Sequence, residues 1–311
     1  MRHVAVPFIV VVLSVISARC SGREVTGPSD VPKATTPFLP PRSDAAFPVE
    51  QSRPEVFVGA GDIALCTSDG RHEETARLLD GIGGTVFALG DNAYSSGSAE
   101  EYRNCYDRTW GRHKSRTRPV AGNHEYESPG ASPYFEYFGP NAGPYGVGYY
   151  SFDLGGWHVV ALNSNVPVSA GSAQGEWLRA DLSASRATCT LAYWHHPRFS
   201  SGQHGDQGQM RDFWQILHDA GAEIVLSAHD HTYERFAPQD PGGFPDGARG
   251  IRQFVVGTGG AKPYPFTNVR ANSEVRLSTI GVLKLTLSAG GYDWEFVPVS
   301  GPGDFGTGVC H

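Results

Sequence analysis

Short apolar runs alternate with amphipathic segments from residue 56 onwards. Residues 56–60, 85–89 and 118–121 are short, largely apolar stretches of the length expected of buried strands. Residues 73–80 and 100–108 lie between them and are predicted to be helices, the first with Ala76, Leu78 and Leu79 on its inner side. The pattern therefore predicts strand, helix, strand, helix, strand, an order that is typical of parallel βαβ units.

The remainder of the chain continues the alternation without an internal repeat or a linker. A hairpin turning at Gly155 and Gly156 is expected to join strands at residues 149–154 and 157–163. Further strands are predicted at residues 188–194, 222–227, 251–256, 281–287 and 292–299, and further helices at residues 173–183 and 212–219. We therefore expect an α/β fold in which residues 54–311 form a single domain. Its architecture should be two mixed β-sheets packed face to face and flanked by helices.

The first residues have the features of an export signal. Residues 1–20 begin with the short basic segment Met1-Arg2-His3 and contain a thirteen-residue apolar run that is too short to span a membrane comfortably. Cys20 lies in a context similar to a bacterial lipoprotein signal, although Arg19 stands where a small residue is expected. Ordinary cleavage near Ala18 and lipidation of Cys20 therefore both remain open.

Residues 21–53 are rich in Pro, Ser and Thr and show no apolar periodicity, which predicts a disordered tether. Together with the export signal, this indicates an exported bacterial protein, either extracellular or anchored at the cell surface.

Composition narrows the range of partners. Charged residues make up 18% of the chain and it contains 39 glycines, which suits a loop-rich α/β protein. The net charge of −7 argues against a nucleic-acid binding patch or an anionic membrane surface. A local phosphate site remains compatible with this charge, because bound metal ions are not included in the count.

Four cysteines follow the predicted tether: Cys66, Cys105, Cys189 and Cys310. An even number of cysteines in an exported chain predicts two disulfides, for which three connectivities exist. We favour Cys66–Cys105 and Cys189–Cys310, since the first would tie two loops near the polar motifs and the second would fix the last residues to a core strand. Buried free thiols are the alternative.

Polar side chains follow five of the predicted strands, at the point where each strand ends. They are Asp62, Asp91, Asn123, His195, and the pair His229 and His231. Taken singly, each has an ordinary explanation such as a turn, a helix cap or a surface pair. Two cations held about 3.5–4 Å apart need a shared carboxylate and separate ligands for each, and this ordered set supplies that mixture. His229 and His231 would face the same way on an extended segment.

This ordered set resembles the calcineurin-like metallophosphoesterases, and within them the purple acid phosphatases and their bacterial secreted relatives. The resemblance covers about residues 56–260. The usual family pattern has a His two residues after the first Asp, where this chain has Ala64. Tyr94, three residues after Asp91, lies where the purple acid phosphatase branch has a metal-binding phenolate. The run from His231 to Arg235 is also similar to that branch, although Ala228 replaces its usual Gly.

The resemblance implies two metal ions. One would be held by Asp62, Asp91, Tyr94 and His231, and the other by Asp91, Asn123, His195 and His229, with Asp91 bridging. A phenolate and carboxylates suit Fe(III) at the first position, while Fe(II), Zn or Mn could occupy the second. The alternative for Tyr94 is an ordinary aromatic residue of the core.

The resemblance also implies a function. The expected reaction is hydrolysis of a small phosphate monoester by a metal-bound hydroxide, without a covalent enzyme intermediate. His124 is the candidate for stabilising the transition state or protonating the leaving group, and His204 for contacting the substrate. His196 and Asp230 are expected to support the ligands, and Glu125 to hold His124 or the backbone.

Two other functions remain open. The same site could serve a phosphodiesterase or nucleotide hydrolase, and a non-catalytic surface binding protein could have kept the scaffold of such an enzyme. The oligomeric state and the physiological substrate are not determined by the sequence.

Overall fold

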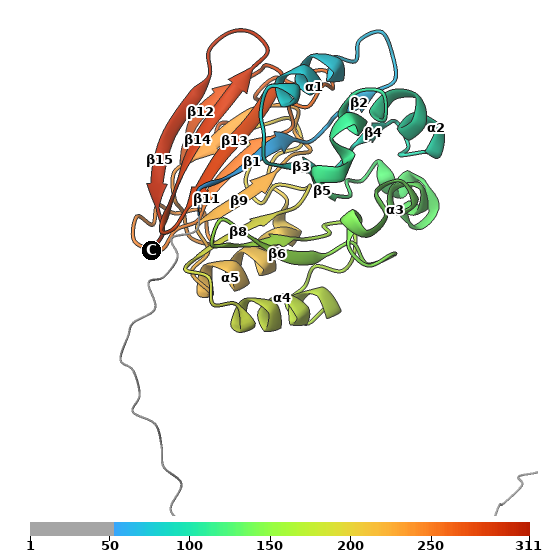
Figure 1. The fold of residues 1–311 in the computed structure, drawn as a ribbon. Helices are drawn as coiled ribbons and strands as arrows, with labels where there is room; N and C mark the ends of the chain where they lie inside the picture. Colours follow the sequence, from blue (N-terminus) through green and yellow to red (C-terminus); the bar gives the residue numbers. More distant parts are fainter. Residues whose placement is uncertain (1–52) are drawn as a thin grey trace, which may run out of the picture. The chain divides into compact units, whose positions relative to one another are not determined.

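Two large β-sheets lie against each other in the computed structural model, which describes residues 53–311 (Figure 1). The predicted export signal, the predicted tether and the candidate anchor at Cys20 lie outside the described residues, apart from Arg53. The mixed α/β architecture with flanking helices confirms the predicted fold class.

The first sheet has six strands in the order β15-β14-β13-β1-β3-β5. Their bounds are β1 (Glu55–Ala60), β3 (Thr85–Leu89), β5 (Thr117–Val120), β13 (Gly281–Ser288), β14 (Gly291–Pro298) and β15 (Asp304–Val309). β1, β3 and β5 are parallel, as the βαβ pattern predicts, and β13 pairs antiparallel with β1. The parallel strands therefore all end at the same edge of this sheet.

The second sheet has seven strands in the order β12-β10-β11-β9-β8-β7-β6. Their bounds are β6 (Tyr150–Leu154), β7 (Trp157–Ala161), β8 (Cys189–Tyr193), β9 (Ile224–Ser227), β10 (Tyr233–Phe236), β11 (Arg252–Val256) and β12 (Ser273–Leu277). β7, β8, β9 and β11 are parallel, while β6, β10 and β12 run antiparallel to their neighbours. A small parallel pair, β2 (Ala64–Leu65) and β4 (Ala93–Tyr94), lies after β1 and β3.

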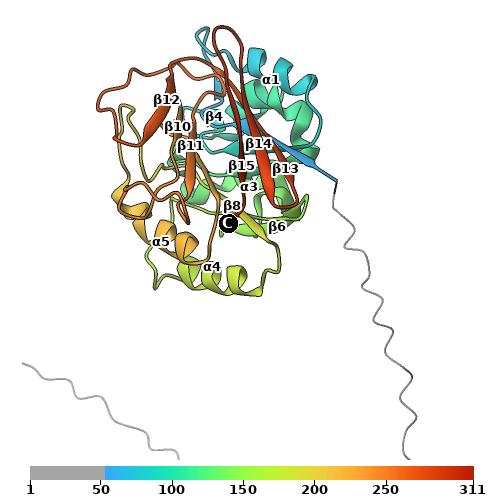
Figure 2. The same ribbon diagram turned by 90° about the vertical axis from the view of Figure 1, so that its left-hand side faces the viewer.

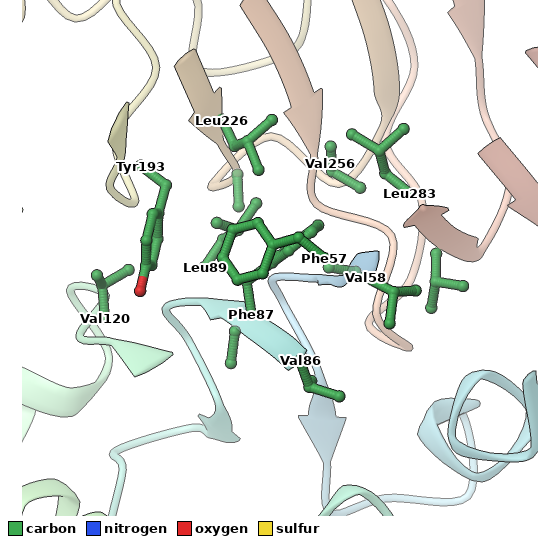
Figure 3. Close-up of a cluster of buried hydrophobic side chains, with 14 of the residues drawn as sticks. Phe57, Val58, Val86, Phe87, Leu89, Val120, Tyr193, Leu226, Val256 and Leu283 are labelled. Atoms are coloured by element: carbon green, nitrogen blue, oxygen red, sulfur yellow. The ribbon is translucent and has the colours of Figure 1, made fainter. Parts of the chain in front are cut away.

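Aromatic and aliphatic side chains fill the space between the two sheets (Figure 3). The Phe57 ring of β1 lies 4.8 Å from the Phe87 ring of β3 and 5.6 Å from the Tyr193 ring of β8, measured between centroids. On β8, Leu191 and Tyr193 face this core, and Ala192 between them faces the opposite side. Burial on both faces explains why β8 shows no regular alternation of apolar and polar residues.

Helices cover the outer face of the seven-stranded sheet (Figure 1 and Figure 2). α4 (Ala173–Ala184) and α5 (Arg211–Asp219) bury Leu178, Phe213 and Trp214 against Ala192 and other strand residues. Ser172 caps α4 by accepting the Gly175 N–H. Both helices lie within two residues of their predicted bounds.

The other helices are no longer than α5 and lie mainly between β1 and β6 in the sequence. They are α1 (His72–Asp80), α2 (Ala99–Glu101), the π-helical η1 (Tyr102–Tyr106), η2 (Trp110–Arg116), η3 (Glu125–Glu127), η4 (Pro129–Ala131), α3 (Ser132–Phe138), η5 (Gly139–Ala142) and η6 (Gly208–Met210). Together α2 and η1 occupy most of the single helix that was predicted at residues 100–108. No helix in residues 53–311 is long and apolar enough to cross a membrane.

The sequence did not predict five of the strands: the two-residue β2 and β4, and β10, β12 and β15. For β15 and β10 the structure gives a physical reason. In β15 every second residue is small because aromatic rings of β14 cover its inner face. A Cβ atom at Gly306 would lie 2.2 Å from the Trp294 ring, and one at Gly308 would lie 2.3 Å from the Tyr292 ring. In β10 the buried Glu234 interrupts the apolar pattern, and its carboxylate accepts the Ser201 N–H at 2.8 Å.

The structure contains two disulfides with the favoured connectivity, Cys66–Cys105 and Cys189–Cys310. The second closes a sequence separation of 121 residues and ties the end of the chain to the first residue of β8. A disulfide lowers the conformational entropy of the unfolded chain, and it does so more when it closes a longer loop. This bridge should therefore contribute more to stability than the first, which spans 39 residues.

Replacing both Cys189 and Cys310 by Ser should lower the free energy of unfolding by about 2–5 kcal/mol. The site residue His195 lies at the far end of β8 from Cys189, so the substitution should leave the site intact. Urea unfolding and metal content, compared with the Cys66→Ser/Cys105→Ser protein, measure both effects. A change below about 1 kcal/mol would show that the bridge does not constrain the unfolded chain as expected.

Candidate metal centre

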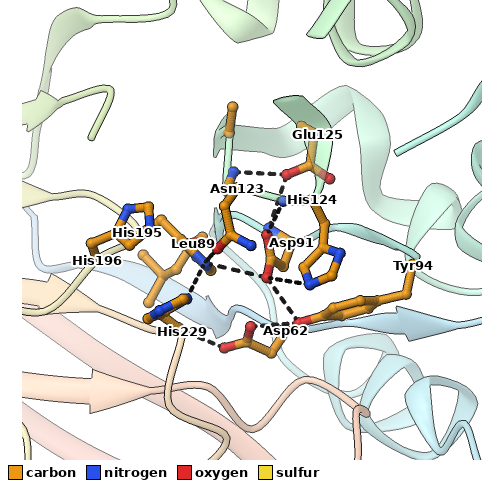
Figure 4. Close-up of polar contacts among 12 residues, drawn as sticks. Asp62, Leu89, Asp91, Tyr94, Asn123, His124, Glu125, His195, His196 and His229 are labelled. Atoms are coloured by element: carbon orange, nitrogen blue, oxygen red, sulfur yellow. Dashed lines mark hydrogen bonds and ion pairs between the residues drawn. The ribbon is translucent and has the colours of Figure 1, made fainter. Parts of the chain in front are cut away.

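All seven predicted ligand residues meet where the parallel strands end; Figure 4 labels six of them, and the seventh, His231, contacts the Tyr94 hydroxyl. Asp62 and Asp91 follow β1 and β3 by two residues, and His195 and His229 follow β8 and β9 by two residues. The remaining three are Tyr94 in β4, Asn123 after β5 and His231 before β10. Both sheets thus contribute residues to one cluster.

The backbone at this edge adopts conformations that direct these side chains inward. Asp62, Asp91 and His229 have φ angles of 57°, 49° and 69°, and they are three of the four non-glycine residues with positive φ in the described chain. Such conformations cost about 1–3 kcal/mol each and concentrate at functional sites. Gly122 allows the close approach of the β5 loop, because a Cβ atom there would lie 2.1 Å from Asp91 Oδ1.

The first group of residues is centred on the Tyr94 hydroxyl. It lies 2.6 Å from Asp62 Oδ1, 3.1 Å from Asp91 Oδ2 and 3.2 Å from His231 Nε2. Asp62 is fully buried and Asp91 is 2% exposed. Burial, strengthened by both carboxylates, raises the pKa of Tyr94 well above its ordinary value. A phenolate at this position therefore requires a cation beside it.

The second group is centred on His195 Nε2. This nitrogen lies 3.3 Å from Asp91 Oδ2, 3.1 Å from Asn123 Oδ1 and 3.2 Å from His229 Nδ1. Asp91 Oδ2 therefore takes part in both groups, between the Tyr94 hydroxyl and His195.

Backbone carbonyls fix which ring nitrogens face the cluster. His195 Nδ1 lies 2.8 Å from the Leu89 carbonyl, and His231 Nδ1 lies 2.8 Å from the Lys262 carbonyl. Because a carbonyl only accepts hydrogen bonds, Nδ1 carries the proton in each ring, and the lone pair of a neutral ring is on Nε2. Metal-binding histidines show this same arrangement.

Acceptor oxygens lie beside these lone pairs: Asp91 Oδ2 and Asn123 Oδ1 beside His195 Nε2, and Asp62 Oδ1 3.5 Å from His231 Nε2. A positive charge in the space between them is therefore favourable, and without a metal ion a proton can supply it. Although burial opposes charge on the His195 ring, Asp91 raises the pKa of His195 to about 9. Burial alone would raise the pKa of Asp91, but His195 and His124 hold it below its ordinary value. The donor set of carboxylates, imidazoles, an amide oxygen and a phenol therefore fits a pair of metal cations.

His229 and His231 contribute to different groups, one to each. The expectation that they lie on an extended segment is wrong, because His229 has a left-handed backbone. The His229 N–H donates to Asp62 Oδ2 at 2.8 Å, which fixes this bend. Asp230 between them turns away and accepts the His204 N–H at 2.8 Å, so it supports the His204 loop.

The two predicted catalytic histidines contact different residues of the cluster. The His124 N–H donates to Asp91 Oδ1 at 2.9 Å, and His124 Nε2 lies 3.8 Å from Asp91 Oδ2. One third of the His124 side chain is exposed, so solvent can reach it. The His204 ring lies 4.3 Å from the His229 ring, measured between centroids.

Glu125 holds the backbone of the loops, which is one of the two roles expected for it. Its carboxylate accepts the N–H groups of Asp91, Asn92 and Gly122 at 2.7–2.9 Å, and the Tyr102 hydroxyl at 3.1 Å. Burial, with a smaller contribution from Asp91, raises the pKa of Glu125 to about 7. The loops after β3 and β5 are thus joined through one buried side chain.

Sequence reasoning did not identify several contacts of the site. The Tyr264 ring stacks on the His231 ring with centroids 4.0 Å apart, and the Leu89 and Lys262 carbonyls orient two of the histidines. Tyr264 and Lys262 belong to the loop between β11 and β12, which carries no motif. Backbone carbonyls leave no signature in the sequence, so these contacts could not have been found from it.

Comparison with known proteins agrees with this geometry. A family model described as calcineurin-like phosphoesterase matches residues 56–233. The chain therefore belongs to the calcineurin-like phosphoesterase family, which confirms the resemblance seen in its motifs.

Within this family the chain is similar to plant purple acid phosphatases. It is 32% identical to purple acid phosphatase 21 of Arabidopsis thaliana over 217 residues, which cover 62% of this chain and 46% of that protein. Purple acid phosphatase 23 of the same plant is 33% identical over 156 residues, covering 44% of this chain and 34% of its own length. The chain thus spans less than half of these relatives.

The fold also matches solved structures. Purple acid phosphatase PPD1 from yellow lupin (Lupinus luteus) gives a TM-score of 0.68 at 18% identity, covering 83% of this chain and 54% of that one. GAP50, described as the anchor in the inner membrane complex of Plasmodium, gives a TM-score of 0.61 at 16% identity, covering 83% of this chain and 89% of that one. At these identities the likeness shows the shared fold alone.

Glu125→Gln should lower the free energy of unfolding of the chelator-treated protein by about 2–4 kcal/mol, because an amide nitrogen would face backbone donors. Urea unfolding without metal separates this effect from metal binding. Glu127→Gln is the matched control, since Glu127 lies two residues further on and is exposed. Equal stability of both variants would contradict the role of Glu125 in joining the loops.

Proposed function

We propose that this protein is an exported phosphohydrolase with two metal ions, and that it cleaves phosphate monoesters. The observation that carries the proposal is the pair of ligand groups sharing Asp91, in which carboxylates and imidazole lone pairs converge at distances that two bound cations would stabilise. The similarity to purple acid phosphatases supports the same reaction class.

One metal would be held by Asp62, Asp91, Tyr94 and His231, and the other by Asp91, Asn123, His195 and His229. The phenol and carboxylates of the first set are hard ligands that suit Fe(III), and the second set suits Fe(II), Zn or Mn. When bound, two such cations lower the pKa of a water nucleophile and neutralise charge on phosphoryl oxygens.

The remaining residues would bind the substrate and move a proton. His124 is partly exposed beside Asp91, which supports its role as the group that protonates the leaving oxygen or stabilises the transition state. His204 borders His229 from a separate loop, which supports contact with the substrate.

Export is supported by the two disulfides, since such bridges persist in oxidising compartments. The substrate would be a small phosphorylated molecule. Lipidation of Cys20 and ordinary cleavage both remain compatible with this proposal.

A phosphodiesterase or nucleotide hydrolase is the alternative, because the same residues can serve both esters. A binding protein without activity is also compatible with the fold alone, which GAP50 shares. The complete set of seven donor side chains favours an enzyme over such a binding protein.

Hydrolysis of an aryl phosphomonoester, compared with the matching diester, tests the proposal. We expect faster monoester turnover, its loss on treatment with a chelator, and no turnover by Asp91→Asn, which should lose both metals. A preference for the diester would favour the alternative function. Bound metal without turnover of either ester would contradict the proposal for aryl substrates.

Tyr94→Phe tests the assignment of Fe(III). The oxidised protein should absorb visible light through a phenolate bound to iron, and the variant should lose this band. Absorption spectra together with metal analysis measure the effect, with Tyr264→Phe as the control for a nearby tyrosine outside the proposed ligand set. A colourless, active protein that contains only Zn or Mn would exclude iron at this position.

A further inference from the structure

His196 follows the proposed ligand His195 directly, and it borders the same half of the site. One ring nitrogen from each of His195, His196 and His229 lies within 4.8 Å of the other two. The centroid of the His196 ring is 4.6 Å from that of His229 (Figure 4). Distance alone would therefore allow His196 to bind a metal ion or a substrate.

Ser164, in the loop after β7, determines the tautomer of the His196 ring, that is, which ring nitrogen carries the hydrogen. The Ser164 hydroxyl oxygen accepts the backbone N–H of His196 at 3.3 Å and lies 2.8 Å from His196 Nδ1. Within residues 53–311, Nδ1 is the one acceptor in hydrogen-bond contact with the hydroxyl proton. The Ser164 hydroxyl therefore donates a hydrogen bond to Nδ1. A neutral His196 ring then carries its own hydrogen on Nε2.

This state is the opposite of that in the proposed ligands. In His195 and His231 the Nδ1–H donates a hydrogen bond to a backbone carbonyl, so the Nε2 lone pair is free for a metal ion. In His196 the Nδ1 lone pair is already used, and Nε2 is a donor. No protein acceptor for this donor occurs in the described part of the chain, and the ring is partly exposed. A donor in this position suits an anionic oxygen and does not suit a cation.

We propose that His196 is a substrate-binding residue whose Nε2–H donates to a non-bridging oxygen of the phosphoryl group. The proposal rests on the proposed phosphohydrolase function and adds a reason why the protein would prefer phosphate monoesters to diesters. His196 and His204 border His229 with centroid distances of 4.6 Å and 4.3 Å, from two different loops. A monoester has one more unesterified oxygen than a diester, so an additional donor favours the monoester.

Binding of inorganic phosphate to the metal-loaded protein tests the proposal without turnover. His196→Ala should keep both metals and bind phosphate about 10–100-fold more weakly, the range expected for a hydrogen bond to a charged group. His196→Gln keeps a donor and should recover part of the affinity. In the kinetic assay, His196→Ala should lower kcat/KM for the monoester more than for the diester.

Ser164→Ala provides an independent measurement. It keeps the His196 ring and removes the hydroxyl that determines the tautomer of this ring. It should weaken phosphate binding in the same direction, and adding it to His196→Ala should produce no further loss. His218→Ala is the matched control, since His218 lies at the end of α5 and bonds to Asp246. Phosphate affinity of the control should be unchanged.

Two results would overturn the role of His196. Loss of metal from His196→Ala would make it a metal ligand, and unchanged phosphate affinity in a folded, metal-loaded His196→Ala protein would exclude the contact. Failure of the proposed function looks different, because the unmodified metal-loaded protein would then either prefer the diester or neither bind phosphate nor hydrolyse either ester.

Discussion

The burial of two carboxylates constrains the rest of this molecule. Asp62 is fully buried and Asp91 almost so, and a buried charge is stable only beside a positive partner or a set of hydrogen-bond donors. Around them lie the Tyr94 hydroxyl, which donates to Asp62, and imidazole lone pairs, which are acceptors. Cations reconcile this combination, since they satisfy every acceptor at once. The surrounding loops can be understood as the structure that keeps these acceptors together.

The two sheets provide the rigidity that this arrangement needs. Parallel strands bring polar side chains to one edge of the sheets, and the Phe57, Phe87 and Tyr193 rings hold the sheets together just below that edge. Left-handed backbone at Asp62 and Asp91 is unfavourable locally. Glu125 offsets the cost at Asp91 by accepting backbone N–H groups from the loops after β3 and β5. The packed core and the buried Glu125 carboxylate therefore stabilise the unfavourable backbone conformations at the site.

The histidines at the site differ through the group that each Nδ1 contacts. Where Nδ1 meets a carbonyl, as in His195 and His231, Nε2 can bind a cation. Where Nδ1 meets the Ser164 hydroxyl, as in His196, Nε2 can donate to an anion. Adjacent residues of the same type thus acquire opposite chemistry. The difference comes from neighbours that are distant in the sequence.

The sequence by itself determined the order of the βαβ units, the fold class and the family, because buried strands and the polar residues that follow them are local patterns. It also identified the residues that meet at the site. Tertiary structure decided the backbone bend at His229, the stacking of Tyr264 on His231 and the tautomer of each imidazole. It also decided that the glycine-rich residues 304–309 form strand β15. These depend on backbone carbonyls, hydroxyls and rings that approach from remote segments, and such contacts leave no periodic trace along the chain.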